Sequence, residues 1–179
     1  GYSNLVLNHI LKNSGLSPQD GAFAGALFYG VLERKLTLDF AIGRYSSKKL
    51  RALSPEVREI LRLGFYQILY MDSVPDSAVC NEAVKLAQKK GFYNLKPFVN
   101  GVLRTVARQM DELEYPSREK NLVRHLSVRY SMPEPLVLRW LNVYGEEITE
   151  KMLADFLEEK PVTVRCRTYL NSVDKICES

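Results

Sequence analysis

LRLGFYQILY, at residues 61–70, is the most informative stretch of this 179-residue sequence. Its apolar side chains occupy nearly the whole circumference of a helix, which is typical of a helix that other helices surround. Ser54 and Pro55 precede it, and a serine N-cap followed by a first-turn proline is a strong signal for a helix start. The stretch therefore predicts a central, deeply buried helix that begins at Pro55.

Helical periodicity continues upstream of this central helix, where apolar faces predict helices near residues 5–11, 18–31 and 36–42. Ser3-Asn4 is the expected N-cap of the first of these helices, and Ser17-Pro18 opens the second. Inside the second helix, Gly25 and Gly30 indicate a close approach to a neighbouring helix, because glycine otherwise destabilises a helix interior.

Downstream of the central helix, the pattern predicts a helix that ends at Lys89-Lys90-Gly91 and another that begins near Asn94. Residues 113–117 contain Pro116 and favour a linker. An amphipathic helix is then expected over residues 121–130. The fold is therefore predicted to be mainly helical, with a first domain that ends near Leu113.

The last third of the chain shows two further kinds of pattern. Ser131-Met132-Pro133-Glu134 is typical of a capping box at a helix start, and Gly145 is expected to break the helix that follows. Apolar and polar residues alternate over 162–170, which indicates a strand. Because a lone strand lacks sheet partners, we expect the chain to be part of a longer protein. The predicted fold class is an all-α bundle, a helical linker region and a C-terminal strand that begins a truncated α/β subdomain, divided as residues 1–113, 114–160 and 161–179.

Composition excludes several classes of protein. Hydrophobic residues make up 46% and charged residues 26%, which are ordinary globular values and argue against wholesale disorder. Charged residues interrupt every apolar run before it reaches membrane-spanning length, so no membrane partner is expected. The three cysteines, Cys80, Cys166 and Cys177, form no C-x-x-C pair. This argues against a disulfide framework or a zinc site and favours the reducing cytoplasm.

Positive charge is concentrated in the first part of the chain. Residues 1–110 hold 15 Lys and Arg against 8 Asp and Glu, whereas residues 111–160 hold 7 against 11. Residues 83–110 contain six basic residues and no acidic residue. This distribution favours a first domain that faces a polyanion, with an ordinarily solvated surface as the alternative.

Two polar stripes at i, i+4, i+8 spacing are the most specific local signal. One stripe is Asn81, Lys85 and Lys89, and the other is Asn100, Arg104 and Arg108. Like charges stacked at i, i+4 repel each other, so an anion such as an RNA phosphate would stabilise them. The candidate RNA-binding residues are Lys85, Lys89, Arg104 and Arg108, followed by Lys48, Lys49 and Arg51. A solvated helix face remains the alternative, and the asparagines could be purely structural.

Signatures of catalysis are absent from the sequence. His9 and His125 lack an accompanying serine, cysteine or acid pattern, and no glycine-rich loop follows a predicted strand. Most aromatic residues, including Phe65 and Trp140, occupy core-facing positions and so do not favour an exposed stacking platform. We therefore predict neither a catalytic residue nor a metal ligand in these residues.

Several motifs together carry a family resemblance. LRLGFYQILY leads through Val74-Pro75 to NEAVKLA at residues 81–87 and FVNGVLR at residues 98–104. These motifs resemble the NusB antitermination-factor fold, an all-helical RNA-binding domain.

Upstream and downstream motifs resemble one particular version of this domain. DGAFAG at 20–25, LFYGVL at 27–32 and Leu38-Asp39 are similar to the domain that opens bacterial rRNA cytosine-5 methyltransferases of the Sun/Fmu type. Residues 130–145 resemble the linker helices of those enzymes. Residues 161–165, PVTVR, resemble the first strand of their small RNA-recognition-like subdomain.

The resemblance implies a function for the parent protein. The parent is expected to transfer a methyl group from S-adenosylmethionine to carbon 5 of a cytosine in small-subunit rRNA. Its catalytic cysteines and cofactor pocket are expected beyond Ser179, so no cofactor is expected here. The expected partners are small-subunit rRNA and the downstream methyltransferase domain of the same chain. The resemblance also implies that the family's first helix, which carries an arginine-rich RNA contact, is missing here, because the sequence opens just after it. Exposed apolar surface is expected where that helix would pack.

Two alternatives to rRNA docking stay open at this stage. The chain could be a stand-alone NusB-like transcription antitermination factor or a module that docks a protein. The bundle could also serve mainly as an intramolecular brace on a catalytic half.

Overall fold

The computed structural model describes residues 2–109 and 113–158, and these residues form helices and connecting segments without any strand. The α-helices are α1 (Ser3–Asn13), α2 (Pro18–Glu33), α3 (Lys35–Tyr45), α4 (Pro55–Tyr70), α5 (Asp76–Lys89), α6 (Lys96–Gln109), α7 (Leu122–Arg129) and α8 (Glu134–Asp155). Two short 3-10 helices, η1 (Leu50–Ala52) and η2 (Tyr93–Leu95), lie in the connections before α4 and α6. The all-helical prediction is thus confirmed for the described residues.

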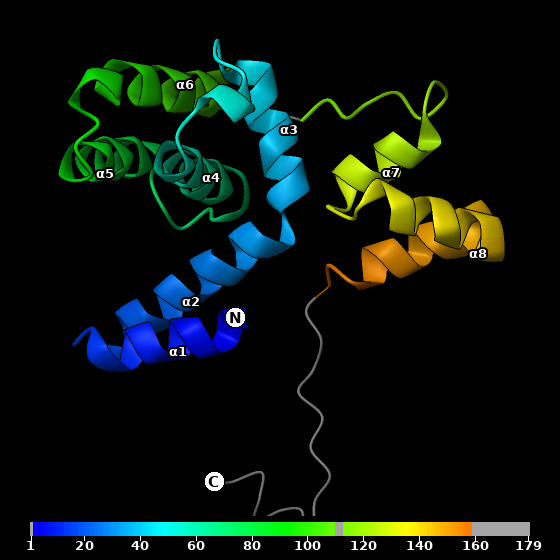
Figure 1. Cartoon of the computed structure of the whole chain (residues 1–179), viewed down its shortest axis with the longest axis horizontal. Helices are drawn as coiled ribbons and strands as arrows, with labels where there is room; N and C mark the ends of the chain where they lie inside the picture. Colours follow the sequence, from blue (N-terminus) through cyan, green and yellow to red (C-terminus); the bar gives the residue numbers. More distant parts are fainter. Residues whose placement is uncertain (1, 110–112, 159–179) are drawn as a thin grey trace, which may run out of the picture.

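Helix α4 is the centre of the first unit, as its sequence predicts. It packs against α2, α3, α5 and α6, and Figure 1 shows α5 and α6 on one side of it and α3 on the other. Leu61 and Phe65 are completely buried. The Ser54 hydroxyl accepts a hydrogen bond from the Val57 amide at 3.4 Å, which confirms the predicted N-cap.

The remaining local predictions concern two other helix starts and the two glycines of α2. The Ser17 hydroxyl accepts from the Asp20 amide at 3.1 Å and confirms the start of α2. The predicted Ser3-Asn4 cap is wrong, because α1 begins after Tyr2 without a side-chain cap. A Cβ atom at Gly30 would lie 2.0 Å from the Tyr66 ring, which confirms a close α2–α4 approach, whereas the space beside Gly25 is open.

A buried ion pair joins α3 to α4. The Arg62 side chain is almost fully buried, and it donates two hydrogen bonds to the Asp39 carboxylate, at 2.6 and 2.8 Å. It also pairs with Glu59 one turn earlier on α4. Burial alone would lower the pKa of Arg62, but Asp39 and then Glu59 outweigh burial and raise it. This cation therefore has a structural role inside the first unit.

Helices α7 and α8 form a second, smaller unit that packs against α3 (Figure 1). The buried Thr37 hydroxyl donates a 2.6 Å hydrogen bond to the Val128 carbonyl. The Ser131 hydroxyl accepts a 3.0 Å hydrogen bond from the amide of Leu36, in the first turn of α3. The predicted capping box is therefore wrong: Pro133 takes the N-cap position of α8, and Ser131, at φ 54°, caps α3 instead.

Two further predictions concern the C-terminal half. Gly145, at φ 76°, leaves the helical conformation, so α8 consists of two helices that meet at a kink there, which confirms the predicted break. The predicted strand over 162–170, and with it the subdomain 161–179, lies outside the described residues. No helix in residues 2–109 and 113–158 is long and apolar enough to cross a membrane.

Candidate nucleic-acid interface

A basic groove of about 570 Å³ runs between α5 and α6, which lie side by side in Figure 1. Its lining residues are Asn81, Val84, Lys85, Lys96, Pro97, Asn100 and Arg104. The two polar stripes thus meet in space, because α5 contributes Asn81 and Lys85 while α6 contributes Asn100 and Arg104. Rigid helices hold three cations and two amides around one hollow, an arrangement that can bind an anion.

Hydrogen bonds orient the polar groups of this basic groove. The Arg104 Nε donates to the Asn100 Oδ1 at 3.2 Å, which leaves the Asn100 Nδ2 as a donor. Lys85 pairs with Glu82, one turn earlier, at 2.7 Å, and both side chains are 71% exposed. Because exposed pairs are weak, a phosphate can compete with Glu82 for the Lys85 ammonium.

Two predicted residues of the stripes lie outside the basic groove. The Arg108 Nε donates to the Arg104 carbonyl at 3.2 Å, one turn beyond the groove. Lys89 instead lines the neighbouring groove described below.

The second predicted cluster, Lys48, Lys49 and Arg51, occupies the connection between α3 and α4. The Lys48 ammonium lies 5.5 Å from the centroid of the Phe98 ring, a cation–π contact with α6. None of the three lines the basic groove, so the structure does not bring them together with Lys85 and Arg104 there.

Lys96 is the groove cation that the sequence reasoning did not select. It is the first residue of α6 and lies four residues before Asn100, so the stripe on α6 extends one turn further than proposed. The i, i+4 spacing of Lys96, Asn100 and Arg104 was the signal that could have identified it.

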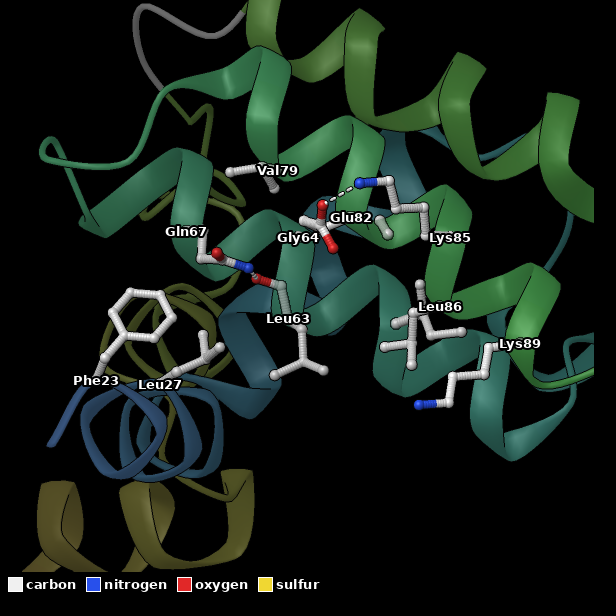
Figure 2. Close-up of a pocket in the computed structure, with 12 residues that line it drawn as sticks. Phe23, Leu27, Leu63, Gly64, Gln67, Val79, Glu82, Lys85, Leu86 and Lys89 are labelled. Atoms are coloured by element: carbon white, nitrogen blue, oxygen red, sulfur yellow. Dashed lines mark hydrogen bonds and ion pairs between the residues drawn. The ribbon is translucent and has the colours of Figure 1, made fainter. Parts of the chain in front are cut away.

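A second groove, of about 420 Å³, lies between α2, α4 and α5 and is shown in Figure 2. Its lining is mostly apolar and includes Phe23, Leu27, Leu63 and Leu86. The polar residues that line it are Gln67, Glu82, Lys85 and Lys89. Lys85 therefore lines both grooves, and a ligand that crosses α5 could contact both.

Cys80 lies on α5, and its side chain is buried. Burial raises the pKa of its thiol, which disfavours the thiolate that a cysteine nucleophile needs. No cluster of three potential metal ligands occurs in the part of the chain that the structure describes.

Sequence comparisons place the chain among known proteins. It is 36% identical over 168 residues to a probable ribosomal RNA small subunit methyltransferase B of Bacillus subtilis, covering 92% of this chain and 36% of that protein. A Synechocystis protein of the same description is 30% identical over 178 residues, covering 99% of this chain and 40% of the relative. The transcription antitermination protein NusB of Bacillus licheniformis is 34% identical over 110 residues, covering 61% of this chain and 85% of that protein.

The chain thus spans well under half the length of the methyltransferase relatives that it matches. Its residues 1–108, which include α1 to α5 and most of α6, match the family model described as the NusB family. The helices, the buried central helix and these matches agree, and the chain belongs to the NusB family.

Proposed function

We propose that this chain is the RNA-binding N-terminal portion of an S-adenosylmethionine-dependent small-subunit rRNA cytosine-5 methyltransferase that acts in the cytoplasm. The main observation that supports this proposal is the share of the chain that aligns with each kind of relative. The two methyltransferase relatives cover 92% and 99% of the chain, whereas the antitermination relative covers 61%. The similarity to methyltransferases therefore continues through α7 and α8.

The proposed task of the chain is to dock rRNA for a downstream catalytic domain. The basic groove supports this proposal, because Lys85, Lys96 and Arg104 can bind phosphates without reading base sequence. Lys89 and Arg108 extend the basic surface along the two helices. Lys48, Lys49 and Arg51 would add a second, separate contact with the RNA backbone.

The cofactor is assigned to the rest of the parent protein. S-adenosylmethionine carries a positive sulfonium, which Lys85 and Lys89 beside the two grooves would repel. The grooves of this chain therefore do not fit the cofactor, and we derive no methyl-transfer step from them. Binding and orienting the RNA is the contribution that these residues can make.

The experiment is a fluorescence-anisotropy titration of the 179-residue chain with a small-subunit rRNA hairpin, at about 50 mM and about 200 mM salt. Binding should weaken steeply with salt, and Lys85→Gln and Arg104→Gln should each reduce the salt slope by about one. Lys151→Gln is the matched control, because Lys151 is 76% exposed and pairs with Glu147 one turn away, much as Lys85 pairs with Glu82. If Lys85→Gln and Lys151→Gln reduced RNA affinity equally, the proposal that the basic groove binds RNA specifically would be contradicted.

One observation favours a second candidate, a stand-alone antitermination or protein-docking module: the match with the Bacillus licheniformis NusB protein covers 85% of that protein. The two candidates differ in the reading frame of the parent gene. A cofactor-binding sheet encoded after Ser179 would support the methyltransferase, and a stop codon soon after it would support the alternative. In a third arrangement the bundle only braces the catalytic half, and rRNA affinity would then survive charge reversal at Lys85 and Lys89.

A further inference from the structure

Helix α8 carries exposed apolar side chains that the second unit leaves uncovered. Its large exposed apolar residues, counting its C-cap, are Leu136, Leu138, Val143, Tyr144, Ile148 and Phe156. The core of the second unit instead uses Val137 and Leu153, which are completely buried. Exposed apolar side chains of this kind mark an interaction surface when they are contiguous.

Helical spacing and one aromatic contact join most of these side chains into a single face. Residues spaced i, i+4, i+7 and i+8 share one side of a helix. Before the kink in α8, this spacing aligns Leu136, Trp140, Val143 and Tyr144. After the kink, it aligns Ile148, Met152 and Phe156. The rings of Trp140 and Phe156 stack with their centroids 5.8 Å apart, so the two halves meet in one surface, which we call the α8 face.

The charge around the α8 face restricts what can cover it. Residues 111–160 hold 7 Lys and Arg against 11 Asp and Glu, so this part of the chain is net acidic. A net negative charge repels RNA phosphates. It also disfavours a second copy of the chain, because a two-fold dimer places each acidic residue near the same acidic surface of its partner. The occupant that fits is a protein surface with an apolar centre and a basic or neutral rim.

The extent of the sequence matches indicates which protein carries that surface. The match with the NusB family model ends at residue 108, before α7 and α8 begin. The Synechocystis methyltransferase relative covers 99% of this chain and therefore includes α8, yet this chain covers only 40% of that relative. The α8 face thus belongs to the part that is matched by methyltransferases, and most of such a protein remains to cover it.

We propose that the α8 face docks the catalytic portion of the parent methyltransferase. This inference rests on the proposed function, and it assigns the contact between the two portions to α8 rather than to the NusB-like bundle. Because both surfaces belong to one polypeptide, their effective concentration is high, and a modest apolar interface is enough to hold them together. The basic groove between α5 and α6 then stays open to rRNA while the catalytic portion is held on the second unit.

The test compares hydroxyl-radical footprinting of the 179-residue chain with that of the full-length parent protein, both without RNA. Tyr144, which is 47% exposed on the α8 face, is the reporter. Tyr93, which is 60% exposed in η2 of the first unit, is the matched control. The oxidation rate of Tyr144 should fall severalfold in the parent, because docking removes water from its ring. The oxidation rate of Tyr93 should be the same in both proteins.

A double variant connects the protection of Tyr144 to the α8 face. Val143→Gln with Ile148→Gln replaces two exposed apolar side chains by polar ones that favour helix, so the melting temperature of the 179-residue chain should not change. In the parent, the same variant should return the Tyr144 oxidation rate to that of the 179-residue chain. Val6→Gln with Ile10→Gln is the matched control, because these residues are equally exposed on α1, and it should leave Tyr144 protected in the parent.

The outcomes separate this inference from the function on which it rests. Equal Tyr144 oxidation rates in the parent and the 179-residue chain, or protection that survives in the Val143 and Ile148 double variant, would overturn the inference. Protection of Tyr144 in the 179-residue chain would also overturn it, and would assign the α8 face to a second copy if it rose with protein concentration or to RNA if it required the rRNA hairpin. The anisotropy titration judges rRNA docking independently of these results. A stop codon soon after Ser179 would overturn both the inference and the methyltransferase assignment.

Discussion

Basic side chains on α5–α6 and on the α7–α8 unit have different surroundings. In the basic groove, Lys96 and Arg104 lack an acidic partner among the described residues, and Lys85 has a single exposed one. In the second unit, Arg118 pairs with both Glu146 and Glu150, at 2.6 and 2.7 Å. Arg124 and Lys151 pair with Glu134 and Glu147.

The difference shows that the number of cations alone does not mark a binding surface. A cation whose charge is already balanced within the fold contributes to structure, whereas an unbalanced one can bind an external anion. Arg62, buried between two carboxylates, is the extreme case of the first kind. Changes to structural cations should therefore alter stability, and changes to groove cations should alter RNA affinity.

The largest effect is expected at the buried ion pair. Asp39→Ala would leave the buried Arg62 with Glu59 alone, and the free energy of unfolding should fall by about 3 kcal/mol. Urea denaturation followed by circular dichroism measures this change. Arg44→Ala is the control, since the Arg44–Glu114 pair is exposed and should change stability by less than about 1 kcal/mol. Similar losses in the two variants would break the distinction between buried and exposed cations.

A smaller loss is expected where the two units meet. Thr37→Val keeps the volume of the side chain but leaves the buried Val128 carbonyl without its hydrogen bond, at a cost of about 1–2 kcal/mol. Urea denaturation again gives the change in free energy. Thr105→Val is a matched control, because the Thr105 hydroxyl also donates to a backbone carbonyl, that of Gly101, but on the exposed surface of α6. A loss at Thr105 as large as that at Thr37 would mean that burial does not explain the effect.

The paired glutamates of the second unit predict a dependence on pH. Hydrogen bonding to Arg118, and then to Tyr130, lowers the pKa of Glu150 below its ordinary 4.5 despite partial burial. A lowered pKa in the folded state stabilises the protein above about 4.5, and that stabilisation is lost as the pH falls through the lowered value. Glu150→Gln should therefore show a smaller drop in melting temperature between neutral and acidic pH. If the drop in melting temperature were unchanged in Glu150→Gln, Glu150 would not be a source of the pH dependence.

The smallest effect on stability is expected in the basic groove. Arg104→Gln should change the free energy of unfolding by less than about 0.5 kcal/mol, because Arg104 is exposed and makes one side-chain contact, with Asn100. Calorimetry with and without the rRNA hairpin would show a lower RNA-induced rise in melting temperature than for the unaltered chain. A large intrinsic loss of stability would place Arg104 among the structural cations.

Local sequence signals predicted features that depend on nearby residues and failed where a distant helix is involved. The Ser54 cap and the buried face of α4 follow from neighbours within one or two turns. Ser131 had the same local signal, yet its hydroxyl bonds to Leu36, which lies 95 residues away in the sequence. A capping pattern identifies a free acceptor, but which helix uses it depends on which helices pack together.

The candidate site divides in the same way. The i, i+4 spacing identified Lys85 and Arg104 as exposed cations on their helices, and one further turn would have added Lys96. Glu82, immediately before the acid-free segment 83–110, pairs with Lys85. The position of Lys89 in the other groove could not be predicted, because that groove needs α2, whose residues lie more than fifty positions away.

The amino-acid sequence alone determines four features of this protein. They are the helix positions, the central place of α4, the excess of positive charge in residues 1–110 and the family resemblance. They depend on periodicity, caps and composition, which act over a few residues or over whole segments. Three other features arise only when distant helices pack. These are the hydrogen bond of Ser131 to α3, the burial of Arg62 between two carboxylates and the two grooves beside α5. Their physical basis is the complementarity of side chains brought together by folding, and no local pattern encodes that complementarity.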